Sequence, residues 1–212
     1  MPADFDVTII GGGVIGLACA RTLSADRSVL LVEQHGLFGS EASSRNSEVI
    51  HAGLYYPPGS LKESLCIAGR KQLYAFCEQH DVPYRRTGKL IVAPSPDHPE
   101  LNRLEQKAQS LNIPTERLTR QEINEREPHV RAEAALFSPE TGILDSHTYM
   151  LRLQQEAERQ GALLMKRTRY LSGKAENGLW NISLQTSDGE FRVTSERMIN
   201  AAGLHSHDVA AR

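Results

Sequence analysis

The chain has 212 residues, of which 40% are hydrophobic, enough for one large domain or for a domain with a partial second one. Lysine and arginine number 24 and aspartate and glutamate 26, so the formal charge is −2. This balance argues against nucleic acid as a partner and favours a small-molecule ligand. The three cysteines have neither CxxC nor metal-ligand spacing, and no apolar stretch approaches membrane-span length. We therefore expect a soluble, cytoplasmic protein without a metal site.

A strand, a glycine-rich turn and a helix are predicted at the start of the chain. The apolar run DVTII ends directly on glycines, and the segment after Gly16 is rich in helix-forming residues. A second β-branched run, Ser28 to Gln34, has strand length and lies far enough along the chain for a crossover helix. The order of these elements predicts a parallel βαβ unit.

A long helix is predicted next. Ser60 and Glu63 have the spacing of a capping box, which predicts a helix from Ser60 to about Gln79. Apolar residues recur at helical spacing along it, so we expect one buried face formed by Leu61, Leu65, Leu73, Phe76 and Cys77.

The following segments alternate between predicted strands and helices. Thr87–Ala93 is a predicted strand, and Asp97 is expected to cap a helix. Thr119 and Glu122 repeat the capping-box spacing. A further helix is predicted from Ser146 to Gly161.

The last third of the chain predicts strands that return to the first sheet. Asp188-Gly189 between two strand-like runs is a hairpin signal, and the final run RMINAAG is assigned to the same sheet as the first strand. We therefore predict an α/β fold, with a Rossmann-like dinucleotide-binding domain and an inserted second lobe. The predicted division gives residues 1–83 and 145–212 to the dinucleotide-binding domain and 84–144 to the lobe.

Three glycines predict where a dinucleotide would bind. Gly11, Gly13 and Gly16 fit G-x-G-x-x-G, in which they allow a tight turn, close approach of a pyrophosphate, and close packing of helix on strand. Glu33 ends the second strand, where it can accept hydrogen bonds from both ribose hydroxyls and would repel the extra phosphate of NADP. The pattern does not separate FAD from NAD, and an incidental turn beside a solvated glutamate is the alternative.

The polar stretch SSRNSEVIHAGLYY, residues 43–56, is by composition either a set of contacts to a longer cofactor or a serine-rich surface loop. Together with GKLIVA at 88–93, TGILDSHTY at 141–149 and MINAAGLHSHDVA at 198–210, it resembles the L-2-hydroxyglutarate dehydrogenase/oxidase family. That family belongs to the FAD-dependent D-amino acid oxidase superfamily. The similarity runs in order along the whole chain.

The resemblance implies FAD as the cofactor and an L-2-hydroxy acid as the substrate, with L-2-hydroxyglutarate oxidised to 2-oxoglutarate. It also implies electron delivery to oxygen or to a membrane quinone pool, and with it a peripheral position at the inner face of the membrane as a second expectation for location. An amino acid or amine oxidase of the same superfamily is the alternative activity.

The resemblance also implies cofactor contacts beyond the glycine loop. The serines and the asparagine of 43–47 would line the pyrophosphate and ribityl region, residues 201–203 the adenosine half, and the backbone near Tyr170 the adenine. The complete predicted cofactor-binding set is Gly11, Gly13, Val14, Ile15, Gly16, Glu33, Gln34, Ser43, Ser44, Asn46, Ser47, Tyr170, Ala201, Ala202 and Gly203.

His51 is the predicted catalytic base. Hydride transfer from a hydroxy acid requires a group that takes the hydroxyl proton, and a neutral imidazole suits this task near neutral pH. A covalent link to the flavin and simple packing are the alternatives for His51. Tyr55 and Tyr56 are predicted to contact substrate or close the pocket, with packing as the alternative. Lys89 would meet a substrate carboxylate as a point charge or else be an exposed surface lysine.

Members of the resembled family are considerably longer than this chain. The resemblance therefore implies that the inserted segment is an incomplete α+β substrate lobe, and that a further half completes this lobe and closes over the flavin ring. A second chain that supplies this half is an expected partner, and a truncated, non-catalytic dinucleotide-binding fragment is the alternative function.

Overall fold

The structure, a computed structural model, describes residues 2–212. The chain forms two compact units, one from the residues up to Ser47 together with Ser146–Arg212, and the other from Glu48–Asp145. The units differ from the predicted division at its first boundary, because residues 48–83 group with the second unit. Among the helices that the structure describes, none is long and apolar enough to cross a membrane.

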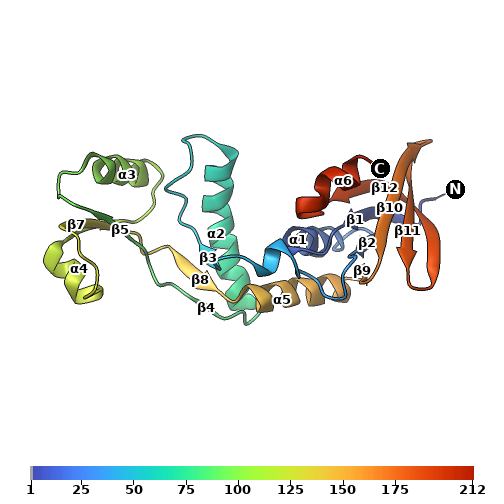
Figure 1. The fold of residues 1–212 in the computed structure, drawn as a ribbon, viewed down its shortest axis with the longest axis horizontal. Coiled ribbons are helices and arrows are strands. Elements are labelled where there is room, and N and C mark those ends of the chain that lie inside the picture. Colours follow the sequence, from blue (N-terminus) through green and yellow to red (C-terminus); the bar gives the residue numbers. More distant parts are fainter. Residues whose placement is uncertain (1) are drawn as a thin grey trace. The chain divides into compact units, whose positions relative to one another are not determined.

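The first unit is built on one six-stranded sheet (Figure 1). Its strands are β1 (Phe5–Ile10), β2 (Val29–Val32), β9 (Leu163–Met165), β10 (Arg169–Glu176), β11 (Leu179–Thr186) and β12 (Gly189–Asn200). Its helices are α1 (Val14–Leu23), α5 (Ser146–Arg159), α6 (Ser206–Ala210) and the short 3₁₀ helices η1 (Ala42–Ser44) and η2 (Gly203–His205). The strand order is β10-β11-β12-β1-β2-β9.

The centre of this sheet is parallel. β1 pairs in parallel with both β2 and β12, and β9 continues the parallel order beyond β2. All four residues of β2 are buried, as expected for a parallel strand covered on both faces. Leu30, Val32 and Ile10 share a core cluster with Val209 of α6. The parallel βαβ unit and the return of the last strand to the first sheet are thus confirmed.

Two antiparallel hairpins extend the sheet from β12 through β11 to β10. The turn between β10 and β11 is Asn177-Gly178, with φ of 53° and 81°, as a two-residue turn with positive φ at both positions requires. The turn between β11 and β12 lies between the paired residues Thr186 and Gly189. The predicted hairpin is therefore confirmed, with its two-residue loop one position earlier than Asp188-Gly189.

The second unit contains two small antiparallel sheets, with strand orders β3-β8-β4 and β5-β7-β6. The strands are β3 (Val49–Ile50), β4 (Tyr84–Arg85), β5 (Leu90–Ala93), β6 (Glu116–Thr119), β7 (Ala134–Phe137) and β8 (Gly142–Leu144). The helices are α2 (Leu61–Gln79), α3 (Pro99–Ser110) and α4 (Arg120–Arg126). The predicted fold class, a Rossmann-like α/β domain with an inserted α+β lobe, is thus confirmed.

Two details of the helices differ from the predictions. The side chain that caps α3 belongs to His98, which accepts from the backbone N–H of Glu100 at 3.3 Å, so the prediction of Asp97 was wrong. Leu61 and Leu65 of α2 are 76% and 65% exposed, whereas charged side chains on the opposite face are buried. The prediction was therefore wrong for Leu61 and Leu65, because the ion pairs of Glu63 and Arg70 bury the other side of this part of α2, whereas Phe76 and Cys77 are buried as predicted.

Replacing Thr119 by alanine is expected to lower the free energy of unfolding by about 1 kcal/mol. The Thr119 hydroxyl accepts from the backbone of Glu122, and the Glu122 carboxylate accepts from the backbone of Thr119 at 2.7 Å, so the capping box at α4 is complete. Urea unfolding measures the loss. Thr115→Ala, outside any helix cap, is the control, and an equal loss in both variants would contradict the capping argument.

Candidate functional site

The glycine-rich loop joins β1 to α1 in the first unit. Gly11 has a φ of 108°, and a Cβ placed there would lie 2.5 Å from the carbonyl oxygen of Ala201. A Cβ at Gly16 would lie 2.0 Å from the carbonyl oxygen of Gly11. Both contacts are with backbone atoms, which side-chain rotation cannot relieve. The loop therefore reaches its conformation only with glycine at these two positions.

The N-terminus of α1 is suited to a phosphate. Its first turn carries no acidic residue, and Gly13 provides no capping side chain. The Ser43 hydroxyl accepts from the backbone N–H of Val14 at 3.0 Å. The first-turn N–H groups and the positive end of the helix dipole favour an anion at this position.

Glu33 follows β2 and turns its carboxylate toward the glycine loop. The side chain is buried, with Oε2 accepting from the N–H of Gly12 at 2.9 Å and Oε1 from the N–H of His35 at 2.8 Å. Each carboxylate oxygen can accept a further hydrogen bond. Two ribose hydroxyls would use these two acceptor positions.

The other predicted adenosine contacts lie beside this loop. The N–H of Ala201 donates to the carbonyl of Ile10 at 2.8 Å, which holds the end of β12 next to the glycine turn. The N–H of Thr168 donates to the carbonyl of Glu33 at 2.8 Å, which brings the start of β10 to the same edge. The residues present at the carboxyl edge of the parallel strands therefore fit the ADP half of a dinucleotide.

Several predicted cofactor contacts have other partners in this structure. The Ser44 hydroxyl donates to the carbonyl of Glu41 at 2.9 Å, and the Asn46 amide donates to the carbonyl of Ser43 at 2.7 Å. Tyr170 is 6% exposed and packs in the core of the first unit, which leaves its backbone for the predicted adenine contact. Gln34 and Ser47 are exposed. The roles of these residues stay predictions.

The structure adds a bridge that the sequence did not indicate. Oε1 of Glu41 lies 2.6 Å from Nε2 of His35 and 3.3 Å from Nε2 of His205. The hydrogen bond to His35 and the charge of His205 lower the pKa of Glu41. The bridge joins the Glu33 turn, the Ser43 helix and the segment after β12. Its members are too far apart in the chain to form a recognisable motif.

The predicted catalytic and substrate residues come together in the second unit. His51, Tyr55, Tyr56 and Lys89 line one small pocket of about 20 Å³, which is room for about one water molecule. Lys89 is half-buried, with its Nζ 4.3 Å from the centre of the Tyr55 ring, so it is not the exposed surface lysine of the alternative interpretation. Lys62 lies over the Tyr56 ring at 4.7 Å and was not predicted.

Positive charge gathers around His51. Burial lowers the pKa of the His51 imidazole, and the charges of Lys89 and Lys62 lower it further. The neutral ring is therefore favoured over the imidazolium, and a neutral ring is the form that accepts a proton. The arrangement combines a proton acceptor with two cations that attract carboxylates.

Replacing Lys89 by methionine is expected to raise the pKa of His51, because the change removes a nearby positive charge. A base works only when neutral. As the pH is lowered, any activity that depends on His51 would therefore begin to fall at a higher pH in this variant than in the wild type. An NMR titration of the His51 ring, in protein without substrate, measures the shift. Lys71→Met, at an exposed position of α2, is the control. Equal titrations of His51 in the two variants would contradict this electrostatic account.

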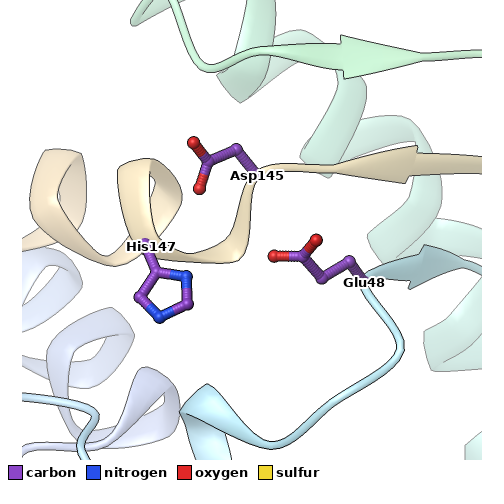
Figure 2. A group of neighbouring side chains, drawn as sticks. All are labelled: Glu48, Asp145 and His147. Carbon is purple, nitrogen blue, oxygen red and sulfur yellow. The ribbon is translucent and has the colours of Figure 1, made fainter.

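Two acidic residues, Glu48 and Asp145, are the first and last residues of the second unit. Figure 2 shows Glu48, which precedes β3, and Asp145, which follows β8. Glu48 and Asp145 are half-buried, and a carboxylate oxygen of one lies within 4.8 Å of a carboxylate oxygen of the other. The N–H of Leu144 donates to the carbonyl of Glu48 at 3.1 Å, so pairing of the strands brings the two acids together. No local sequence signal indicates this proximity.

Named proteins of known sequence resemble the chain along nearly its whole length. The L-2-hydroxyglutarate dehydrogenase, mitochondrial, of Arabidopsis thaliana is 37% identical over 237 residues, covering 98% of this chain and 49% of that protein. The protein of the same name from Caenorhabditis elegans is 38% identical over 215 residues, again covering 98% and 49%. The chain thus spans about half the length of the curated relatives it matches.

Solved structures share the fold. Glycine oxidase from Geobacillus kaustophilus superposes with a TM-score of 0.83 at 23% identity, covering all of this chain and 58% of that one. The dithionite-reduced L-alpha-glycerophosphate oxidase from Mycoplasma pneumoniae, solved with FAD bound, gives a TM-score of 0.84 at 28% identity, with 93% and 54% covered. These matches agree with the α/β sheet and the antiparallel lobe described above.

The model of one protein family matches residues 6–212, and the family's description is FAD dependent oxidoreductase, abbreviated DAO. The match therefore includes the glycine loop, Glu33 and the end of β12. It also confirms the resemblance that was based on the polar stretch and the later motifs. The chain belongs to the DAO family of FAD-dependent oxidoreductases and is a homologue of the L-2-hydroxyglutarate dehydrogenases.

Proposed function

We propose that the protein oxidises L-2-hydroxyglutarate to 2-oxoglutarate with FAD as its cofactor. The observation that carries this proposal is the 37% identity with a named L-2-hydroxyglutarate dehydrogenase along 98% of the chain. The pocket in the second unit supports it, because a hydroxy acid needs a proton acceptor and a dicarboxylate suits a cluster of positive charge. His51 supplies the acceptor, and Lys62 and Lys89 supply the charge.

FAD, when bound, supplies the hydride acceptor. We assign the pyrophosphate to the glycine loop and the N-terminus of α1, and the ribose hydroxyls to Glu33. An imidazole nitrogen of His51 takes the proton of the substrate hydroxyl. Because burial and two lysines lower the pKa of His51, the ring is neutral and ready to accept that proton near neutral pH.

The two lysines orient the substrate in this proposal. Lys62 and Lys89 attract its carboxylates, and the positive potential that they create also draws an anion toward the pocket. The pocket has room for about one water molecule, so its residues form one wall of the proposed substrate site. The neighbouring Tyr55 and Tyr56 rings form the apolar part of that wall.

The chain spans about half the length of its curated relatives, so we propose the complete activity for this chain together with a counterpart of their remaining length. That counterpart would belong to the same polypeptide or to a second chain. Oxygen or a membrane quinone is the proposed electron acceptor.

The flavin absorbance of the purified protein tests this function. We expect a yellow protein whose flavin bleaches without oxygen when L-2-hydroxyglutarate is added. Bleaching only by amino acids or amines would favour an amino acid or amine oxidase. Those substrates differ from hydroxy acids in the protonation state that the reacting group needs. Bound FAD that no substrate reduces would indicate a non-catalytic dinucleotide-binding fragment. A colourless protein that FAD cannot reconstitute would contradict the proposal.

A further inference from the structure

Residues 51–59 carry His51, Tyr55 and Tyr56 but belong to no helix or strand. A segment without the hydrogen bonds of regular structure keeps one conformation only if other groups hold its backbone. Side chains of α2 and α3 provide such groups at both ends of this segment.

The first end of the segment is held by α2. Nη1 of Arg70 donates to the carbonyl of Ala52 at 2.9 Å, and the thiol of Cys66 donates to the carbonyl of His51 at 3.4 Å. The Arg70 side chain is 3% exposed, and its Nε lies 3.3 Å from Oε2 of Glu140 as an ion pair. A buried guanidinium thus bonds the backbone directly after the predicted base.

The second end is held by a second buried ion pair. Oε2 of Glu63 accepts from the N–H of Gly59 at 2.8 Å. Nζ of Lys107, in α3, lies 2.8 Å from Oε1 of Glu63 and also donates to the carbonyl of Tyr56. The two charged side chains are 6% and 9% exposed, so the pair is almost fully removed from water.

These contacts explain which face of α2 is buried. Glu63 and Arg70 are seven residues apart on one helix face, together with Cys66 between them, and that face lies under the segment. Buried ion pairs contribute little net stability compared with well-packed apolar residues of similar size. Their placement is instead accounted for by the backbone groups that they bond, because Arg70 bonds the carbonyl of Ala52 and Lys107 that of Tyr56, and both residues line the pocket.

We propose that Arg70 and Lys107 are positioning residues, which fix the backbone of residues 51–59 and thereby the directions of His51 and Tyr56. The kinetic consequence rests on the proposed function, whereas the effect on the segment does not. The same ion pairs couple α2 to α3 and to the turn before β8.

Hydrogen exchange of the backbone amides in residues 51–59, read by mass spectrometry on the whole chain, tests the proposal. We expect Arg70→Met to speed exchange in this segment about tenfold while exchange in β1 and β12 stays unchanged. Arg103→Met is the matched control, because Arg103 is an exposed arginine of the same unit in an ion pair with Glu100. Where the protein turns over substrate, Arg70→Met should lower kcat about tenfold or more with little change in KM.

A double variant at the other end of the segment gives a second test that does not depend on the folding of Arg70→Met. Lys107→Met alone would leave the Glu63 carboxylate buried without its cation, so we combine it with Glu63→Gln, which leaves no unpaired charge. This double variant should loosen the Tyr56 end of the segment more than the Ala52 end, the reverse of Arg70→Met.

Two results would overturn the proposal. One is exchange in residues 51–59 that matches the Arg103→Met control in both test variants. The other is a uniform rise across the whole second unit, which would show a general contribution to stability. If the wild-type protein lacks turnover but the two test variants still speed exchange only in residues 51–59, the proposed function is rejected and the positioning role stands.

Discussion

Replacing His51 by glutamine is expected to lower kcat for L-2-hydroxyglutarate by about 10² to 10⁴. Glutamine keeps a polar side chain of similar size but cannot accept the hydroxyl proton at neutral pH. Because the lysines of the pocket remain, substrate binding should change far less than turnover. Steady-state kinetics with the flavin content matched between preparations measures both quantities.

Further measurements on His51→Gln distinguish a catalytic base from a covalent flavin link and from simple packing. His129→Gln changes an exposed histidine of the same unit and should leave turnover intact. The activity of wild-type protein should fall on the acid side as the imidazole takes up a proton, and this fall should be absent in the residual activity of His51→Gln. Loss of covalently attached flavin in the variant would instead favour the covalent link. Unchanged kcat would leave packing as the role of His51.

The parts of the fold that could be predicted are those whose determinants lie close together in the chain. The strand, glycine turn and helix that contain Gly11 and Gly16 are one continuous stretch, and Glu33 follows at the end of the next strand. The capping box at Thr119 likewise needs only four residues, as does the Ser60 cap of α2, where the hydroxyl accepts from Glu63 but the Glu63 carboxylate accepts from Gly59 instead of Ser60. Local sequence therefore determined these elements and their approximate ends.

The burial of α2 could not be predicted in the same way. Leucine spacing favoured a buried Leu61 and Leu65, but the buried charges of this helix have their partners in Lys107 and Glu140. A helix face with charged residues is normally exposed, and only tertiary contacts with opposite charge reverse that rule. Such contacts leave no periodic signal in the sequence.

In the candidate site, too, the features that could be predicted are those encoded by local sequence. The glycine loop and the polar stretch were recognisable as motifs, and His51 shares one pocket with the other three predicted residues, Tyr55, Tyr56 and Lys89. Lys62 was missed because a lysine in the first turn of a helix has no distinguishing pattern. The bridge from Glu41 to His35 and His205 was missed because three separate segments form it.

Replacing Gly16 by alanine is expected to destabilise the first unit by about 3 kcal/mol and to abolish FAD binding. The added Cβ would lie 2.0 Å from the carbonyl oxygen of Gly11, far inside van der Waals contact. Relief requires α1 to move away from the loop, which would displace the first-turn N–H groups that we assign to the pyrophosphate. Thermal unfolding and calorimetric titration with FAD measure the two losses separately.

Gly69→Ala is the matched control, because Gly69 is a helical glycine at which a Cβ would meet nothing within 4 Å. Alanine forms helices better than glycine by about 1 kcal/mol, so this variant should be as stable as the wild type or more so. The same substitution thus has opposite expected signs at two helical positions. Propensity alone predicts stabilisation at both, whereas steric contact between α1 and its loop predicts a loss only at Gly16. Retention of FAD by a stable Gly16→Ala protein would show that the loop tolerates a side chain and would remove the packing argument for this glycine.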